Sequence, residues 1–580
     1  MENYGEKKTR GGTVNLPGIL ITALFVLMEA WFFYRLLRMK FLPGKYMWLI
    51  GAVLVLLAAL VAFLCWNMKK KGLFVAGTLL TIILSAGMIV GSGIADKVRN
   101  TFAEQIIVPS TDAYQTAQMG VYVLSDGPIR HLNDLDGKTL GIMESVDRQE
   151  AEQVLDEISA KLTSLEVVTF TGFVEVAQAL YRGEIHAAIL EEGFIEVLGN
   201  ISGFEDVSQR IQKVTEYRAE RPTQPATAPA EESAASTAAD ATETSEVHHG
   251  SRTWRIVNHR TGRAEETDDT KSSTQADASE TWESWEPATV PPTTTAWPEG
   301  PVGTDPPPTQ APAAWGIGVP AGQEGRIFTV YISGLDTRGG GLASRGNSDV
   351  NILASVNMNT RQILLVNTPR DYFVPFPTVG GTDKLTHAGY YGLDASMAAL
   401  RNLYGTGGQY YVQIGFDGLK ALVNALGGVT VYSAYTFSDR GVDFVQGNNT
   451  LNGSEALIFA RARYTLPGGD LARGQNQMAL IRAILAKLTS SAAVSNFGQV
   501  MDSLGGLMRT SVPYDTIAAL SQSTLEGGWN VASYSVGGSG GMTYSFSIGQ
   551  TAYVLYPDYG TVGYAQSLIR RLYNGEYVSP

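Results

Sequence analysis

Three long apolar runs open the chain and constrain its fold more than any other feature. They cover residues 16–37, 46–66 and 73–95, and each approaches or exceeds the roughly 20 residues that a helix needs to cross about 30 Å of hydrocarbon. The first run has a basic flank, but it is long, contains Glu29 and is followed at once by two more runs. A cleaved signal peptide is therefore the weaker interpretation, and the sequence predicts three transmembrane helices within residues 1–98.

The charges that flank these runs do not decide the orientation of the helices. With the N-terminus inside, the cytoplasmic segments hold Lys7, Lys8, Arg10, Lys69, Lys70 and Lys71. With the N-terminus outside, they hold Arg35, Arg38, Lys40, Lys45, Lys97 and Arg99. Because lysine and arginine favour the cytoplasmic side, the equal counts leave both topologies open.

The chain of 580 residues is too long for a single core, so several units are expected. Over residues 99–220, short apolar strands alternate with amphipathic helices, which predicts a small α/β unit whose sheet contains parallel pairs. The expected strands are 121–124, 139–143, 165–170 and 186–190, and the expected helices are 149–162 and 173–181.

Residues 221–325 are rich in Ala, Thr, Pro, Ser and Glu. Such a composition cannot bury enough apolar surface to offset chain entropy, so this segment is predicted to be a disordered linker. Residues 252–263 within it are less biased and predict a hairpin or docking peptide.

Composition also excludes several classes of site. Cys65 is the single cysteine, so no intrachain disulfide forms. The six histidines show no HExxH or paired spacing, which argues against a zinc enzyme. The net charge of -13 and a pI near 5.1 argue against a broad nucleic-acid surface.

Acidic and basic residues gather at predicted strand ends in the C-terminal part, residues 326–580. Strands are expected at 327–336, 350–357 and 361–368. Asp336 ends the first strand, Asp349 precedes the second, and Arg370 and Asp371 follow the third. Asp336 and Asp349 also bracket a glycine-rich loop that carries Arg338 and Arg345.

Two carboxylates in this setting suit a hard divalent cation such as Mg²⁺, and nearby guanidinium groups suit phosphate oxygens. The loop is not a Walker A motif. For any one of these residues taken alone, a solvated salt bridge is the simpler explanation.

A second charged cluster follows about a hundred residues later. Arg461 and Arg463 are expected on an extended segment, facing the same way. Asp470, Arg473 and Gln477 are expected at the start of an apolar helix. These three arginines need anionic partners, either the aspartates of the first cluster or a phosphorylated ligand.

The segments GLDTR, NSDVNILASVN, ILLVNTPRDYFV, DKLTHAGYYG and LNGSEALIFARARYTLPGGDLARGQNQ resemble, in order, the LytR-CpsA-Psr (LCP) family of envelope phosphotransferases. The likeness covers most of residues 326–488. It implies an α/β fold with a mixed central sheet flanked by helices, outside the cytoplasmic membrane. It also implies transfer of a glycopolymer phosphate from a polyprenyl pyrophosphate carrier to a peptidoglycan hydroxyl, aided by Mg²⁺.

Carried over by motif, Asp336 and Asp349 would hold the metal. The pyrophosphate would be bound by Arg338, Arg345, Arg370, Arg461, Arg463, Arg473 and Gln477. Family members often have Arg before the Ser-Asp pair, where this chain has Asn347, so Arg345 is the candidate substitute. Asp336, Arg338, Arg370 and Asp371 are the predicted catalytic residues, with Asp371 or Asp336 as the general base.

The lipid tail of the carrier needs an apolar slot. The candidates for its lining are Met397, Leu400, Leu403, Phe416, Leu419, Val423 and Leu426, although ordinary core packing explains them equally well. Farther along, a helix at 497–508, strands at 529–536 and 542–547 and a helix at 561–573 are expected to complete the domain.

The segments HLNDLDGKTLGI and FTGFVEVAQALYRGEIHAAILEE resemble one lobe of the periplasmic solute-binding fold. A single lobe lacks the facing wall of a ligand cleft. A spacer or protein-docking module is therefore favoured over a small-molecule receptor.

The predicted function is that of a membrane-anchored glycopolymer transferase with extracellular C-terminal domains, which requires an inside N-terminus. Its partners would be a polyprenyl pyrophosphate-linked glycan, peptidoglycan and the bilayer, without nucleic acid. Two alternatives stay open: a polyprenyl pyrophosphate hydrolase that uses the same residues, and a non-catalytic envelope sensor or transcriptional attenuator.

Overall fold

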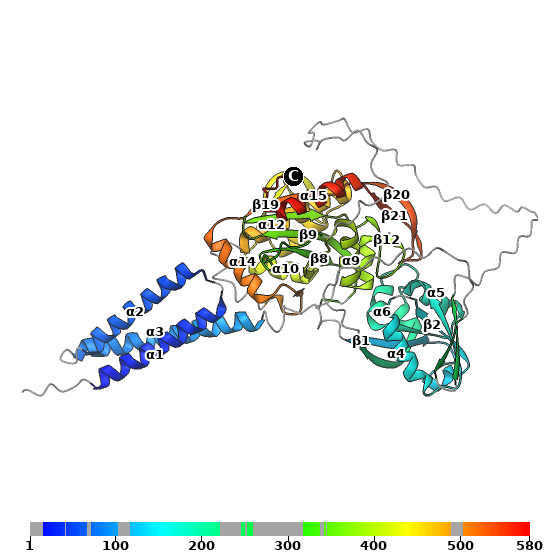
Figure 1. Cartoon of the computed structure of the whole chain (residues 1–580), viewed down its shortest axis with the longest axis horizontal. Helices are drawn as coiled ribbons and strands as arrows, with labels where there is room; N and C mark the ends of the chain where they lie inside the picture. The colour runs from blue at the N-terminus through cyan, green and yellow to red at the C-terminus, as the bar shows by residue number, and fades with distance from the viewer. Residues whose placement is uncertain are drawn as a thin grey trace, which may run out of the picture.

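Three helices and two globular parts make up the computed structural model (Figure 1). The structure describes residues 16–40, 42–66, 71–101, 116–144, 146–220, 245–249, 252–258, 317–336, 342–343, 345–488 and 503–580. The first helices are α1 (Leu16–Met39), α2 (Gly44–Trp66) and α3 (Lys71–Thr101). Each is long and apolar enough to cross a membrane by length and composition, as the sequence predicts.

The predicted small α/β unit forms a sheet with helices packed on it, called the lobe below. Its strands are β1 (Thr116–Leu124), β2 (Lys138–Met143), β3 (Leu165–Phe170), β4 (Ala187–Glu191) and β5 (Ile211–Glu220). Its helices are α4 (Arg148–Ser159), α5 (Phe173–Arg182), α6 (Glu192–Leu198) and α7 (Val207–Arg210). Strand β2 pairs in parallel with both β3 and β4, which confirms the expected parallel pairs.

A hairpin from the predicted linker extends this sheet. Strands β6 (Ser245–His249) and β7 (Arg252–Asn258) pair with each other, and β7 adds in parallel to β3. Of the hairpin or docking peptide expected at residues 252–263, residues 252–258 form one strand of a hairpin whose other strand lies upstream at residues 245–249, and residues 259–263 lie outside the described residues. This stretch of the predicted linker belongs to the sheet of the lobe.

The C-terminal part is built on a six-stranded mixed sheet in the order β18-β13-β8-β9-β10-β19. Its strands are β8 (Ile327–Leu335), β9 (Ser348–Asn357), β10 (Gln362–Asn367), β13 (Tyr410–Gly415), β18 (Met508–Thr510) and β19 (Asn530–Ser535). Strand β9 is antiparallel to β8 and β10, whereas β13 and β19 join in parallel at either side. The mixed α/β class is confirmed.

Alternating side chains of these strands give the sheet two apolar faces. Tyr331 and Leu353 pack on one face with α9 (Leu393–Tyr404) and α15 (Tyr559–Tyr573). Val330 and Ala354 lie on the other face, together with α12 (Gly469–Leu488) and α14 (Tyr514–Glu526). The candidate site lies at the edge of this second face.

Shorter elements complete the C-terminal part. The helices are α8 (Leu385–Ala388), α10 (Phe416–Ala425) and α11 (Gly453–Arg461). The small paired strands are β11 (Phe373–Pro375), β12 (Thr382–Lys384), β14 (Val429–Ser433), β15 (Phe437–Asp439), β16 (Val442–Phe444), β17 (Gly447–Leu451), β20 (Gly538–Ser545) and β21 (Gln550–Pro557).

The helix predicted for residues 497–508 is wrong at its end, because Met508 begins β18, which pairs with β13 at the edge of the sheet. Residues 497–502 lie outside the described residues. The sequence interpretation also missed α14 and β21.

Candidate active site

Asp336, Asp349 and Arg370 meet at one edge of the C-terminal sheet. Asp336 follows the last residue of β8, Asp349 is the second residue of β9, and Arg370 comes after β10. Since β9 runs against both neighbours, these three positions share an edge. Arg370 Nη1 lies 2.5 Å from Asp349 Oδ1. The predicted placement at three neighbouring strand ends is confirmed.

The second cluster reaches the same edge from α11 and α12. Arg461 Nη2 lies 3.8 Å from Asp336 Oδ2, and its guanidinium stacks over the Phe416 ring at 4.2 Å. Arg463 Nη2 lies 2.9 Å from Asp371 Oδ2. Aspartates of the first cluster thus partner Arg461 and Arg463, as one of the two open alternatives predicts.

The expected extended segment at Arg461 is wrong, because Arg461 is the last residue of α11. The helix starts with a capping box in which Asn452 and Glu455 satisfy each other's backbone amides. Its apolar residues then pack into the core, and Ala462 leaves the helical conformation. Arg461 and Arg463 nevertheless reach the same cavity from the helix end and the following turn.

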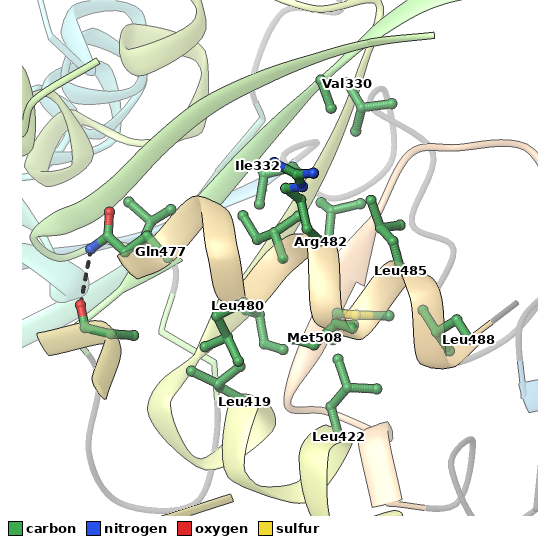
Figure 2. A pocket seen from close by; sticks show the side chains of 18 of the residues that line it. Val330, Ile332, Leu419, Leu422, Gln477, Leu480, Arg482, Leu485, Leu488 and Met508 are labelled. Carbon is green, nitrogen blue, oxygen red and sulfur yellow. Dashed lines mark hydrogen bonds between the residues drawn. The ribbon is translucent and has the colours of Figure 1, made fainter. Parts of the chain in front are cut away.

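Asp470, Arg473 and Gln477 lie on the first half of α12, as expected. Arg473 forms an ion pair with Asp470 one turn earlier. Burial is the largest effect on this pair: it raises the pKa of Asp470 and lowers that of Arg473, and the attraction between the two charges opposes both shifts. Gln477 Nε2 donates to the Ala460 carbonyl at 3.3 Å, which ties α12 to α11 (Figure 2).

Asp371 lies behind the arginines and is not among the residues that line the cavity. Its side chain is 3% exposed and contacts Arg463, Lys384 at 3.4 Å and Arg370 at 3.5 Å. Burial alone would raise its pKa, but Arg370, Lys384 and Arg463 together lower it. Asp371 is therefore placed to orient arginines, and its lowered pKa makes it a weak base. Asp336 remains the candidate base that lines the cavity.

A cavity of about 1720 Å³ extends from this charged edge along the second face of the sheet. The charged end is lined by Asp336, Asp349, Arg370, Arg461, Arg463, Arg473 and Gln477. The remainder is mostly apolar, although Arg482 and Glu526 also line it. Figure 2 shows α12, with Leu480 and Leu485, between the strand that carries Val330 and Ile332 and the helix that carries Leu419 and Leu422.

Part of the predicted apolar slot lines this cavity and part does not. Phe416 and Leu419 of α10 contribute to the lining. Leu400 and Leu403 of α9 are buried in the core on the opposite face of the sheet. The apolar spacing alone does not distinguish the two faces.

The two arginines of the glycine-rich loop, Arg338 and Arg345, are not among the described residues that line the cavity. Arg338 lies outside the described residues, so its predicted phosphate contact stays a prediction. Arg345 does not line the cavity. Its guanidinium instead contacts Asp147 and Glu191 of the lobe. Arg345 is therefore not at the cavity, where it would have to lie to replace the arginine that family members carry at the position of Asn347.

The donor set fits a hard divalent cation only in part. Among the described residues, no group of three or more His, Cys, Asp or Glu side chains is arranged to hold a metal. Asp336 and Asp349 do line the same end of the cavity, and Mg²⁺ commonly uses one or two carboxylates plus substrate phosphate. The two residues are thus compatible with Mg²⁺ bound together with a phosphorylated substrate.

The sequence interpretation missed several residues at the site. Leu36, Met39 and Leu42, at the turn between α1 and α2, line the cavity. Lys384 pairs with Asp371. It lies in the DKLTHAGYYG segment, one of the motifs of the family resemblance, but no role was predicted for it from the sequence.

Two family models match separate parts of the chain. Residues 313–555 match the family model described as the LytR_cpsA_psr family, and residues 103–218 match the model described as NMT1/THI5 like. The residues that line the charged end of the cavity all lie within the stretch that matches the LytR_cpsA_psr family model. The lobe corresponds to the segment that resembles a solute-binding protein.

Two relatives carry the name polyisoprenyl-teichoic acid–peptidoglycan teichoic acid transferase TagU. The protein of Enterococcus faecalis is 38% identical over 189 residues, which is 32% of this chain and 62% of the relative. The protein of Bacillus subtilis is 30% identical over 191 residues, 33% of this chain and 61% of the relative. The chain thus spans about three fifths of the length of each relative.

Among solved structures, the Lin1025 protein of Listeria innocua is 29% identical, with a TM-score of 0.35. The match covers 43% of this chain and 98% of that protein.

Proposed function

We propose that this protein transfers a glycopolymer from a polyprenyl pyrophosphate carrier to peptidoglycan. The observation that carries the proposal is the continuity of one cavity, with arginines and two aspartates at one end and mostly apolar side chains along the rest. A carrier has the same division, because a pyrophosphate joins a glycan to a long apolar chain. The names of the TagU relatives give the acceptor and suggest a teichoic acid as the glycopolymer.

The charged end suits the pyrophosphate. Arg370 lines this end of the cavity, while its Nε is buried 3.5 Å from Asp371 Oδ1 and so helps to orient the guanidinium. Arg461 and Arg473 line the same end. Guanidinium groups fixed by buried carboxylates are already oriented, and preorganised charges stabilise developing negative charge most effectively.

The proposed reaction is a phosphoryl transfer. An acceptor hydroxyl of peptidoglycan attacks the phosphorus that bears the glycan, and the bond from this phosphorus to the bridging oxygen breaks. Polyprenyl phosphate leaves, and the proton of the hydroxyl passes to a base, for which Asp336 is the cavity-lining candidate. The arginines neutralise the charge that grows on the bridging oxygen.

Mg²⁺ is the proposed cofactor, held by Asp336 and Asp349, and it would supply further neutralisation of the pyrophosphate. Arg370 already partners Asp349, so this arginine and the cation would share one carboxylate.

A contact between the membrane helices and the C-terminal part links the orientation of the helices to the location of catalysis. Tyr514 of α14 donates to the Met39 carbonyl at 2.8 Å, and Lys40 pairs with Asp515 at 3.0 Å. The α1–α2 turn therefore lies on the same side as the catalytic part, and the start of α1 lies across the membrane. With catalysis at the wall, the N-terminus is cytoplasmic.

The test uses the purified full-length protein with a polyprenyl-linked glycan and peptidoglycan, with and without Mg²⁺. We expect glycan on the insoluble wall, with loss in Asp336→Ala and Arg370→Ala. Transfer that is unchanged in both variants would remove the proposed site. Glycan released only into solution would favour the hydrolase.

A further inference from the structure

The lobe holds one side chain of the catalytic part in a buried site. Arg345 Nη2 donates to Asp147 Oδ2 at 2.8 Å, and its Nε donates to Glu191 Oε2 at 2.9 Å. A third donor, Nη1, contacts the Tyr390 carbonyl at 3.1 Å. The guanidinium also stacks over the Phe194 ring at 4.1 Å, and the side chain is only 4% exposed.

The two carboxylates lie where open α/β sheets bind ligands. Asp147 follows β2 and stands directly before α4, and Glu191 ends β4 and stands directly before α6; neither side chain makes a capping hydrogen bond. Strands β2 and β4 are parallel, so both carboxylates lie beyond the carboxyl edge of the sheet. In such sheets this edge is the usual ligand site. Arg345 thus occupies the place where a solute would bind in a free lobe.

Aromatic side chains surround this contact. Phe173 of the lobe packs against Tyr390 and Tyr391 at ring distances of 6.0 and 5.8 Å. Phe194 lies 6.3 Å from Tyr391. These residues belong to one hydrophobic cluster that continues from the lobe into the catalytic part, and Figure 1 shows α6 beside that part. The apolar surroundings strengthen the ion pairs and exclude a competing solute.

A short tether joins Arg345 to the candidate active site. Gly346 N donates to the Gly389 carbonyl at 3.1 Å, and the Asn347 carbonyl accepts from Asp336 N at 3.0 Å. Ser348 is fully buried and contacts Asn351 at 3.0 Å. Asp349, which pairs with Arg370, is the next residue along the chain.

We infer that the lobe binds Arg345 as an internal ligand, and that this contact positions Asp336 and Asp349 for the proposed transfer. The positioning role rests on the proposed function, whereas the binding does not. Arg345 is a positioning residue, because it touches neither the cavity nor its charged end. The lobe then serves the catalytic part directly and needs no free solute.

The binding is tested by hydrogen–deuterium exchange of the full-length protein. Arg345→Ala leaves two buried carboxylates without their cation, a change that strongly destabilises such sites, so exchange in residues 345–351 should rise by about tenfold or more. Millimolar guanidinium chloride should restore the protection by filling the vacated site, whereas the same concentration of sodium chloride should not. Arg345→Lys should restore it only in part, because an ammonium group lacks the planar fork.

Glu192→Gln is the matched control. Glu192 is adjacent to Glu191 but pairs with Lys213 on the surface at 3.3 Å, so its loss should leave exchange in residues 345–351 unchanged. Protection of β9 and β10 in every variant confirms that the catalytic part is folded. Unchanged exchange in Arg345→Ala, or no effect of guanidinium, would overturn the binding.

The transfer assay tests the positioning. In Arg345→Ala we expect kcat to fall by about tenfold or more with KM nearly unchanged, since only interactions of the transition state are disturbed. Guanidinium should recover kcat. A loosened segment with normal kcat would contradict the positioning while leaving the transferase proposal intact. Absence of transfer in the wild type would instead contradict the proposed function, and the exchange data would still decide the binding.

Discussion

Asp371 illustrates how a buried charge is stabilised by its neighbours. It is 2% exposed, and Arg370, Lys384 and Arg463 hold its pKa below the usual value despite its burial. A carboxyl whose pKa is lower in the folded protein stabilises the fold above its unfolded pKa of about 4 and loses this effect as the pH falls through the folded value.

Asp371→Asn should therefore lower the free energy of unfolding at pH 7 by about 3 kcal/mol, because it leaves cations without their partner. The difference from the wild type should shrink below about pH 4. Denaturant unfolding of the full-length protein at both pH values measures this. Asp443→Asn, on an exposed hairpin, is the control. An equal difference at both pH values would contradict the assignment.

Arg461 is held in the cavity by an aromatic ring and a carboxylate. It stacks on Phe416 and faces Asp336. Arg461→Ala should reduce the rate of transfer by about 10²-fold, as expected for loss of one preorganised charge. Arg571→Ala removes an exposed pair with Glu576 and should leave the rate unchanged. Equal rates in the two variants would contradict the role of Arg461.

At the scale of elements, α12 connects the two ends of the cavity. Its first turns carry Arg473 and Gln477, and its later turns carry Leu480, Ile481 and Leu485. A single helix would thus contact both the pyrophosphate and the lipid of the proposed substrate, at a distance from each other that the helix sets.

Ile481→Trp should narrow the apolar part without disturbing the charged end. We expect KM for a long-chain carrier to rise by about tenfold, a change in uniform binding, while kcat is retained. A carrier with a short prenyl chain should show little change and serves as the internal control. The same increase for both carriers would contradict binding of the lipid along α12.

The sequence predicts the strand ends of this site because apolar alternation is strong in β8, β9 and β10. Asp336, Asp349 and Arg370 follow from the ends of those strands. The helical position of Arg461 was missed because a short charged stretch was interpreted without the Asn452–Glu455 capping box. The partners of Arg345 lie 154 and 198 positions away in the chain, a pairing that local patterns do not contain.

At the scale of the whole molecule, the α1–α2 turn joins the membrane helices to the cavity. Leu36 and Met39 line its apolar part, so the cavity reaches the end of α1. A lipid carrier embedded in the bilayer would then meet the cavity directly. The sequence did not decide the orientation of the membrane helices, because the flanking charges are equal for both topologies and carry no information about this tertiary contact.

Protease added to intact cells tests this orientation. If the C-terminal part is extracellular, added protease reaches the linker, so cleavage within residues 259–316 should give a C-terminal fragment that separates from the α1-containing fragment on a denaturing gel. A cytoplasmic reporter protein should remain uncut. Protection of the linker until the membrane is opened would contradict the proposed topology.

The transfer of glycopolymer itself is tested most directly by the fate of the phosphate. A carrier labelled at the phosphorus attached to the glycan is incubated with the full-length protein and peptidoglycan. We predict that the label becomes attached to insoluble peptidoglycan together with the glycan, that unlabelled polyprenyl monophosphate is released, and that Arg370→Ala abolishes both. Label that stays on the polyprenyl chain, or that enters solution with the glycan, would contradict the proposed transfer.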